Sequence, residues 1–287
     1  MPTIDVAGGR LSWREAGAGT PVLLIGGTAV NASRWSGVAQ ELGERYRVLV
    51  PDLAAHGGTS AVTPKGHFSI DDEAELMTEL VARCDEPVHL VGHSYGGAVA
   101  LKMALRWPDW IRTLTVVEPA AFHLLRSGDR VDRRVLSQIE AVSGLVAAGA
   151  ASGHPECGMA GFVDFWNGNG TWSALDPDVR TALAAQIGDV LRHFESLYRE
   201  TWSLAALGRM SVPTMVVMGL ESPAVARRVA TLVASATTGA WLSRIPGAGH
   251  MAPFTHPEVV AGLILRNLAR TDARTLIFKP VTIDEAA

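Results

Sequence analysis

Ser94 lies between two glycines in the segment Gly92-His93-Ser94-Tyr95-Gly96. The segment matches the pattern Gly-x-Ser-x-Gly, in which a serine is exposed on a sharp turn between a buried strand and a helix. Both elements are predicted here, because residues 88–91 form an apolar run and residues 98–105 are rich in alanine and leucine. Glycine two positions before and two positions after the serine lets the strand and the helix approach closely. The pattern therefore predicts that Ser94 is a nucleophile.

A serine hydroxyl is a poor nucleophile at neutral pH, so it needs a base within hydrogen-bond reach and an acid that orients the base. His250 follows the last apolar run of the chain, in the glycine-rich loop 246–251, and precedes a predicted terminal helix at Pro257 to Leu268. His256 stands directly before Pro257, where it fits the start of that helix. We therefore predict His250 as the base in preference to His256.

Short apolar runs predict the elements that position these residues. They are residues 21–25, 46–50, 88–91, 114–117, 214–218 and 240–245, separated mostly by helical patterns. Buried strands that alternate with helices are typical of a parallel sheet with helices on both faces. Residues 3–6 and 10–14 alternate in polarity around Gly8-Gly9 and predict a β-hairpin at a sheet edge.

A long segment, residues 120–208, separates the runs 114–117 and 214–218 and far exceeds a simple crossover. It is rich in aromatic residues and contains a predicted helix at Pro177 behind a capping residue, Asp176. We interpret this segment as a mostly helical cap over the strand ends. The alternative is an independent second domain, although a chain of fewer than about 100 residues builds only a marginal core. The core is then residues 1–119 and 209–270, followed by a C-terminal extension, 271–287.

Together, these motifs resemble the α/β-hydrolase fold family over about residues 10–269. The segments that carry the resemblance are GHSYGG at the serine, GTAVNASRW after the first buried strand, PDLAAHGGTS after the next, and PGAGHMAPFTHPE around the late histidine. The resemblance implies an α/β fold, with a mostly parallel, doubly wound sheet and an inserted helical cap.

The same resemblance implies roles for individual residues. Ser94 is the expected nucleophile, His250 the expected base, and the backbone amides of Thr28 and Tyr95 the expected oxyanion hole. Such amides stabilise the negatively charged oxygen of a tetrahedral intermediate. Gly26-Gly27 stands where relatives usually have His-Gly, a departure that leaves the Thr28 amide available.

The acid departs from the family pattern. Most relatives carry an aspartate near the position of Ser222, but this chain has no aspartate between Gly219 and His250, and Glu221 is the only carboxylate there. Glu118 ends the run 114–117, and some relatives, including a branch that resembles the haloalkane dehalogenases, place the acid on this strand. A carboxylate there lies about 5 Å to the side of the nucleophile strand and needs a partner, which an imidazole N–H supplies. We therefore predict Glu118 as the acid, with Glu221 as the alternative.

Weaker candidates for substrate binding are His123, Trp166 and Trp172. His123 lies where the predicted cap begins, and the two tryptophans flank the segment Gly168-Asn169-Gly170, which is a candidate border of the entrance. Cap aromatics are, however, more often core than pocket lining. The chain has no metal-ligand spacing and no phosphate-binding glycine motif, so we expect neither a metal nor a nucleotide cofactor.

Composition limits the partners. The 25 Lys and Arg are offset by 29 Asp and Glu, and no basic block stands out, so a small-molecule substrate is expected rather than nucleic acid. No signal-peptide pattern and no apolar run of about 18 residues is visible, so we expect a cytoplasmic protein without a membrane partner. Residues 275–278 are candidates for an additional edge strand or for contact with a second copy in a homodimer, and the alternative is a loosely tied tail.

The sequence thus predicts a cofactor-free serine hydrolase that acts on an ester, thioester or lactone through an acyl-enzyme. Alternatives with the same residues are hydrolysis of a carbon–carbon bond and perhydrolase chemistry. A small-molecule receptor without catalysis is the alternative from another class. Dehalogenase and epoxide-hydrolase activities are disfavoured, because the relatives with those activities use aspartate where Ser94 stands.

Overall fold

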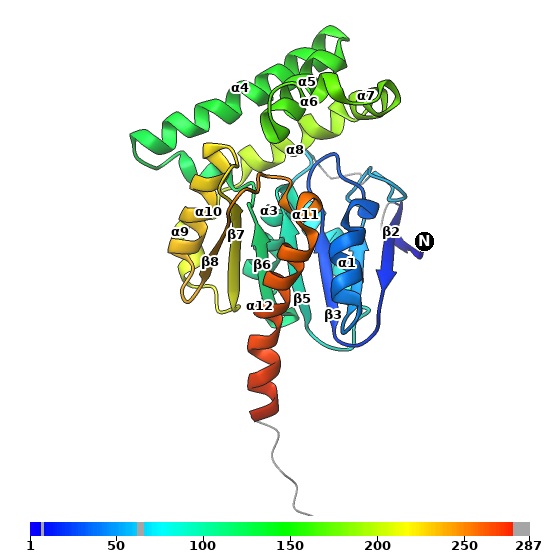
Figure 1. Cartoon of the computed structure of the whole chain (residues 1–287), viewed down its shortest axis with the longest axis vertical. Helices are drawn as coiled ribbons and strands as arrows, with labels where there is room; N and C mark the ends of the chain where they lie inside the picture. Colours follow the sequence, from blue (N-terminus) through cyan, green and yellow to red (C-terminus); the bar gives the residue numbers. More distant parts are fainter. Residues whose placement is uncertain (7–8, 62–65, 278–287) are drawn as a thin grey trace, which may run out of the picture.

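The computed structural model describes residues 1–6, 9–61 and 66–277, with side chains described to residue 271. Within these ranges, eight strands form one sheet in the order β1-β2-β4-β3-β5-β6-β7-β8 (Figure 1). The strands are β1 Thr3–Val6, β2 Gly9–Ala16, β3 Pro21–Ile25, β4 Arg47–Pro51, β5 Val88–His93, β6 Ile111–Val117, β7 Thr214–Gly219 and β8 Trp241–Ile245. β2 pairs antiparallel with β1 and with β4, and the other pairs are parallel. The predicted mostly parallel sheet and edge hairpin are confirmed, while Gly8 lies outside the described residues.

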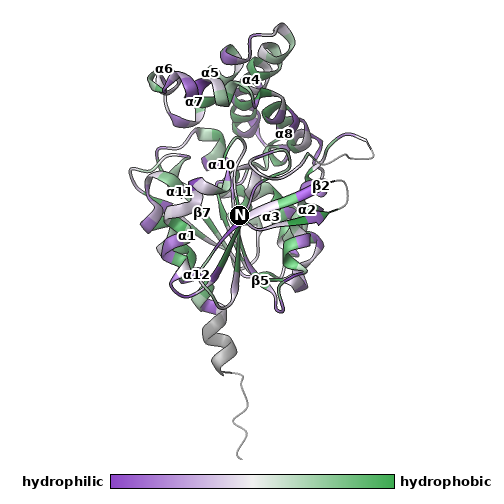
Figure 2. Cartoon of the chain, turned by 90° about the vertical axis from the view of Figure 1, so that its right-hand side faces the viewer, coloured by the Kyte–Doolittle hydropathy of each residue, from purple (hydrophilic) through white to green (hydrophobic). Residues whose placement is uncertain are grey.

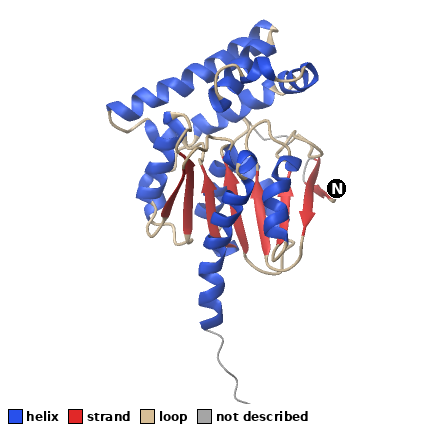
Figure 3. Cartoon of the chain, in the orientation of Figure 1, coloured by secondary structure: helices blue, strands red, loops and turns tan. Residues whose placement is uncertain are grey.

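Helices cover both faces of the sheet (Figure 3). They are η1 Ala32–Trp35, α1 Ser36–Gly43, α2 Ile70–Val81, α3 Tyr95–Arg106, η2 Pro108–Trp110, η3 Phe122–Leu125, α4 Arg130–Ser152, α5 Pro155–Asn167, α6 Thr171–Ala174, α7 Pro177–Ala184, α8 Ile187–Arg199, α9 Leu204–Gly208, α10 Ala224–Ala236, α11 Ala252–Thr255 and α12 Pro257–Ile277. α1, α11 and α12 contribute to one hydrophobic cluster, and α2, α3 and α10 contribute to the other. The arrangement is the doubly wound one expected from the sequence.

Strand β3 explains why two clusters form. Val22 and Leu24 belong to the cluster of α1 and α12, and Leu23 and Ile25 belong to the cluster of α2 and α3. Successive side chains of a strand point to opposite faces, so a fully apolar run can fill both layers. All four side chains are fully buried, and burial of each stabilises the fold by roughly 1.5–3 kcal/mol. Figure 2 shows hydrophobic residues concentrated on the central strands.

Six helices, α4 to α9, are inserted between β6 and β7. Of these, α4 to α8 lie above one end of the sheet, whereas α9 lies at the side of the sheet next to α10 (Figure 1). α7 begins at Pro177, and the Asp176 side chain accepts a hydrogen bond from the Asp178 amide, which confirms the predicted helix start. Val135 and Phe194 from the inserted helices share a hydrophobic cluster with Leu90 of β5. The inserted helices therefore pack on the core of the sheet rather than around a separate core.

An ion pair joins α4, the first of the inserted helices, to α10, which packs on the sheet. The Arg228 guanidinium of α10 donates from Nη2 to Asp132 Oδ2 of α4 at 3.1 Å, and its Nε donates to the other carboxylate oxygen. Asp132 is buried, and the Arg228 hydrogen bonds lower the pKa of its carboxyl group. A bidentate pair of this kind fixes orientation as well as distance.

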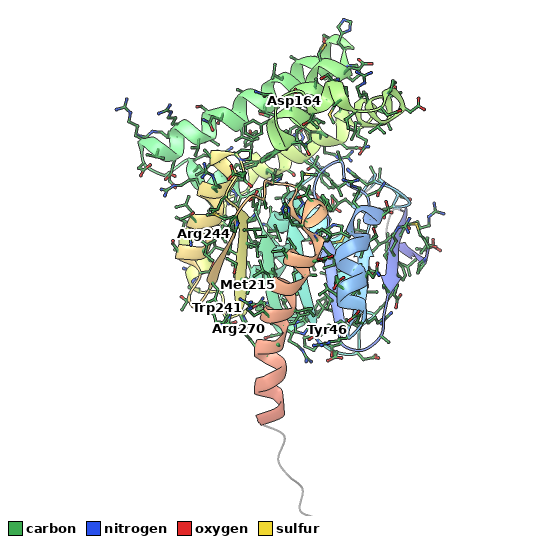
Figure 4. The ribbon with its side chains drawn as sticks, in the orientation of Figure 1. Tyr46, Asp164, Met215, Trp241, Arg244 and Arg270 are labelled. Carbon is green, nitrogen blue, oxygen red and sulfur yellow. The ribbon has the colours of Figure 1, made fainter. Side chains whose placement is uncertain are left out.

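The terminal helix differs from the prediction. α12 continues past Leu268 to Ile277, so residues 275–277 are helical and the predicted edge strand is wrong for them, while Phe278 lies outside the described residues. α12 also contacts the outermost strand at one point, where the Arg270 guanidinium carbon lies 3.6 Å from the Trp241 ring centroid (Figure 4). This cation–π contact covers one face of the Trp241 ring, which remains 45% exposed on β8.

Among the described helices, α4 alone is long and apolar enough to cross a membrane by length and composition. About a third of its most apolar window, 33%, is buried inside the molecule. One helix of this kind is weak evidence for a membrane span, because the core helices of soluble proteins can be equally long and apolar.

Candidate active site

Ser94 occupies the turn between β5 and α3, at the N-cap of the helix, with φ 55° and ψ −119°. This backbone conformation costs a non-glycine residue of the order of 1–3 kcal/mol, so the surroundings must hold it. A Cβ added to Gly92 would collide with the Gly96 carbonyl oxygen, and one added to Gly96 would collide with the Gly26 carbonyl oxygen. The glycines are therefore required by close backbone contact.

His250, in the loop after β8, lies between Ser94 and Glu118. Its Nε2 is 3.1 Å from Ser94 Oγ, and its Nδ1 is 2.6 Å from Glu118 Oε2. A carboxylate only accepts hydrogen bonds, so Nδ1–H is the donor and Nε2 carries the lone pair that faces the serine hydroxyl. His250 and Glu118 are 4% and 2% exposed, so their hydrogen bond is shielded from water. The geometry suits proton transfer from Ser94 to His250.

Glu118 follows β6 directly and has φ 45°. While Oε2 accepts from His250, Oε1 accepts from the Gly219 amide at 2.7 Å and from Ser222 Oγ at 2.5 Å. Three donors from two segments, residues 219–222 and the His250 loop, thus hold one buried carboxylate, which stabilises its charged form. The backbone turn at Glu118 directs its side chain along the sheet edge toward the His250 loop.

Glu221, the alternative acid, is exposed, and its backbone amide donates to the Ala248 carbonyl at 2.9 Å. The structure does not bring its carboxylate to His250. Ser222, at the position where most relatives are expected to carry the acid, is buried and donates to Glu118. The Ser222 hydroxyl therefore occupies the position at which most relatives are expected to carry the acid. It donates a hydrogen bond to the Glu118 carboxylate, which extends from the neighbouring strand β6.

Thr28 and Tyr95 lie beside Ser94, and all three residues line a small cavity. In the described part of the chain, the Thr28 and Tyr95 amides donate to no backbone carbonyl, so both are available to an incoming oxygen. A Cβ added to Gly27 would lie 3.1 Å from Ser94 Cβ. The tight approach explains a glycine here and brings the Thr28 loop against the serine.

His93 is the variable residue of the pentapeptide around Ser94, for which the sequence predicts packing beneath the turn and no chemical role. Its Nε2–H donates to the His250 backbone carbonyl at 2.9 Å, and the two rings lie 4.8 Å apart. Burial, and then the neighbouring His250, hold the pKa of His93 well below its usual value, so its ring is neutral. His93 therefore anchors the loop that carries the base. Its place in the motif, directly before Ser94, was the signal that could have found this role.

Two cavities adjoin Ser94. The small one has a volume of about 20 Å³, and the larger one a volume of about 380 Å³. Trp166 lines both, and its ring stacks on the His250 ring at a centroid distance of 4.0 Å. The other apolar residues that line the small cavity are Ala120, Phe122, Phe162, Val190, Phe194 and Leu197. Among the residues that the structure describes, no three His, Cys, Asp or Glu side chains are grouped as metal ligands.

Two of the predicted substrate-binding residues do not line either cavity. His123 is buried, its Nε2–H donates to the Trp202 carbonyl at 3.0 Å, and burial lowers its pKa to about 4. From the 3-10 turn η3, this ring packs against Trp202, with the ring centroids 4.3 Å apart. The Trp172 amide donates to Asp164 Oδ1 at 2.7 Å, and its side chain packs on the core. Asp164 is labelled among the inserted helices in Figure 4.

Comparison with known proteins agrees with this fold. A model of the alpha/beta hydrolase family matches residues 22–263. The chain is 35% identical over 118 residues to the 2-hydroxy-6-oxo-2,4-heptadienoate hydrolase of Pseudomonas putida, a match that covers 39% of this chain and 42% of that one. It is 30% identical over 129 residues to the pimeloyl-[acyl-carrier protein] methyl ester esterase of Aliivibrio salmonicida, covering 45% and 47%. Each match thus spans less than half the length of these relatives.

Solved structures extend the likeness to the whole fold. The enol-lactonase from Burkholderia xenovorans LB400 superimposes with a TM-score of 0.73 at 19% identity, covering 93% of this chain and 100% of that chain. At this identity, the likeness concerns the fold alone. Since the family model spans most of the sequence, the protein belongs to the alpha/beta hydrolase family.

Proposed function

We propose that the protein is a serine hydrolase that cleaves carboxylic esters, thioesters or lactones of small molecules through an acyl-enzyme on Ser94. The hydrogen-bonded series from Ser94 Oγ through His250 to Glu118 supports this proposal most strongly. The strained turn at Ser94 and the free amides of Thr28 and Tyr95 add the exposed hydroxyl and the oxyanion donors that such chemistry needs.

In the proposed reaction, His250 Nε2 takes the Ser94 proton as Oγ attacks the carbonyl carbon. The carbonyl oxygen becomes negative and accepts hydrogen bonds from the Thr28 and Tyr95 amides, each worth about 2.7–4 kcal/mol in known examples. His250 then donates its proton to the leaving oxygen or sulfur, and the acyl group remains on Ser94. In the second half of the reaction, His250 deprotonates a water molecule whose oxygen attacks the acyl carbon. The bond to Ser94 Oγ then breaks, His250 returns the proton to Oγ, and the acid is released. Glu118 orients the ring and stabilises its charged form throughout.

The two cavities support a division of the substrate. His250 must protonate the leaving group, and it lines only the larger cavity, so the leaving group belongs there. The acyl chain then enters the small cavity, whose volume of about 20 Å³ accepts little more than one water-sized group, since one water needs roughly 10–15 Å³. We therefore propose a short acyl group, such as acetyl, on a larger and mainly apolar leaving group.

A series of aryl esters from acetate to octanoate tests this function. We expect turnover of the acetate and a loss of kcat/KM of at least tenfold by hexanoate, with all turnover lost in Ser94→Ala. Tight binding with less than one product per site would instead favour a receptor. Hydrolysis of a diketone without any ester turnover would favour carbon–carbon bond cleavage.

Two variants test which cavity binds the acyl group and which binds the leaving group. Phe194 lines only the small cavity, so Phe194→Ala should move the optimum toward longer acyl chains. Val179 lines only the larger cavity, so Val179→Ala should leave the acyl-length profile unchanged. The opposite pattern would reverse the assignment of acyl and leaving-group sides.

A further inference from the structure

His193 of α8 reaches from the inserted helices to the loop that carries Thr28. Its Nδ1 lies 3.0 Å from Thr28 Oγ1, a hydrogen bond between residues 165 positions apart in the chain. The ring is 1% exposed, so water does not compete for this contact. A residue of the inserted helices therefore holds the side chain of one of the two expected oxyanion donors.

The same ring also contacts the second expected donor. The His193 and Tyr95 rings stack with a centroid distance of 3.8 Å and an interplanar angle of 9°. Tyr95 is fully buried at the first position of α3, directly after Ser94. Both expected oxyanion donors are thus held through their side chains by one histidine.

A second histidine supports the Thr28 loop from the sheet side. His56 lies parallel to His193 at 5.2 Å, donates from Nδ1 to the Ala54 carbonyl at 2.9 Å, and so presents Nε2 as an acceptor to the Ala29 amide at 3.4 Å. Ala29 has φ 58°, a conformation that a non-glycine residue keeps only under constraint. The loop is therefore strained and held from two sides.

His193 is uncharged in this environment. Burial, followed by the nearby His56 and Arg192, holds the pKa of its ring well below the usual value. Its Nε2 meets no polar partner among the described residues, so the bond to Thr28 is its one hydrogen bond there. A neutral ring can stack closely on Tyr95 and still share a proton with the Thr28 hydroxyl.

We infer that His193 is a positioning residue of the oxyanion hole, through which docking of the inserted helices aligns the Thr28 and Tyr95 amides on Ser94. The inference rests on the proposed serine hydrolase function. It adds that the position of α8 affects how well the oxyanion donors stabilise the transition state. Donor amides stabilise an oxyanion only when they are held in place before the reaction, so a loosened Thr28 loop should slow the chemical step more than substrate binding.

Steady-state kinetics on an aryl acetate test the inference. His193→Phe keeps a stacked ring but removes the hydrogen bond, and Thr28→Val keeps the backbone amide but removes the hydroxyl. We expect each to lower kcat by about tenfold with KM changed less than twofold, and the double variant to lower kcat no further than either single change. His193→Asn, whose side chain offers a polar atom close to the position of Nδ1, should recover part of the loss.

Tyr198→Phe is the matched control, because it removes a hydroxyl of the same helix that donates to Ser143 Oγ at 3.1 Å, away from Ser94. It should change thermal stability slightly and leave kcat unchanged. A His193→Phe variant with wild-type kcat, or losses that multiply in the double variant, would overturn the inference while Ser94-dependent turnover of the wild type upholds the proposed function. An absence of that turnover in the wild type would overturn both.

Discussion

Glu118 follows β6 and Glu221 follows β7, so both lie at the carboxyl ends of two adjacent parallel strands. Their surroundings nevertheless differ in burial and in hydrogen-bond partners. Glu118 is 2% exposed and accepts hydrogen bonds from His250, Gly219 and Ser222. Glu221 is exposed, and its amide is bound to Ala248. Position at the end of a strand is therefore not enough to make a carboxylate the acid that orients His250. The backbone turn at Glu118 and the donor at Ser222 decide which carboxylate meets the base.

The difference is also electrostatic. A buried carboxylate needs partners to remain charged, and a charged one stabilises a protonated His250 far better in the absence of water. An exposed carboxylate is screened and contributes little.

The largest effect is expected for Glu118→Gln. The amide keeps the shape of the side chain but supplies no charge and no longer enforces Nδ1–H on His250. We expect kcat on an aryl acetate to fall by about 10³ to 10⁴, with KM changed little. A fall of less than tenfold would remove Glu118 from the acid role.

Glu73, a third glutamate, is buried like Glu118 but accepts one hydrogen bond where Glu118 accepts three. Oε1 accepts from the Ala54 amide at 3.0 Å, Oε2 meets no partner among the described residues, and burial raises the pKa to about 7. Between its unfolded pKa near 4.5 and about 7 the folded state holds the extra proton, so stability falls as pH rises through this window.

Glu73→Gln should therefore stabilise the fold at high pH. We expect its advantage over the wild type in the free energy of unfolding to grow by about 2–3 kcal/mol between pH 5 and pH 8. Urea titrations of both proteins at the two pH values measure this change. A constant difference would show that Glu73 is already charged, and so partnered, in the folded state.

Ser222→Ala should have a smaller effect, because it removes one of the three donors to Glu118 and leaves the carboxylate in place. We expect kcat to fall by about tenfold, equivalent to about 1.4 kcal/mol. Ser211→Ala, which alters an exposed serine ahead of β7, serves as the control and should have wild-type kinetics. An unchanged kcat in Ser222→Ala would mean that the hydroxyl does not hold the acid.

The smallest effect is expected for Glu221→Gln. The exposed side chain makes no contact with His250, so kcat and thermal stability should remain within experimental error of the wild type. Steady-state kinetics alongside Glu118→Gln provide the direct comparison. A loss in Glu221→Gln that matches the loss in Glu118→Gln would transfer the acid to the later strand.

The sequence predicted the sheet, the hairpin and the juxtaposition of Ser94 with His250 because these depend on local patterns. Apolar runs mark buried strands, and a serine between close-packed glycines marks the turn. Glu118 was predictable because a charge at the end of a buried strand needs a partner. The length of α12 was underestimated because residues 275–278 were interpreted as a candidate strand, although no glycine or proline ends the helix between Leu268 and Ile277.

Contacts made by the inserted helices could not be predicted in the same way. His193 meets Thr28 across 165 positions, and only the docking of α8 brings them together. His123 was expected near the site because it follows Glu118 closely, yet η3 directs its ring toward Trp202. The orientation of helices on a core depends on side-chain packing, which periodicity does not reveal.

The central claim is that Ser94 is a nucleophile activated by His250. The most direct measurement is the intact mass of wild type and Ser94→Ala after incubation with a fluorophosphonate, which loses fluoride as the serine oxygen binds phosphorus. We expect the mass of one adduct per wild-type chain and no adduct on Ser94→Ala. An unlabelled wild type, or equal labelling of both proteins, would contradict it.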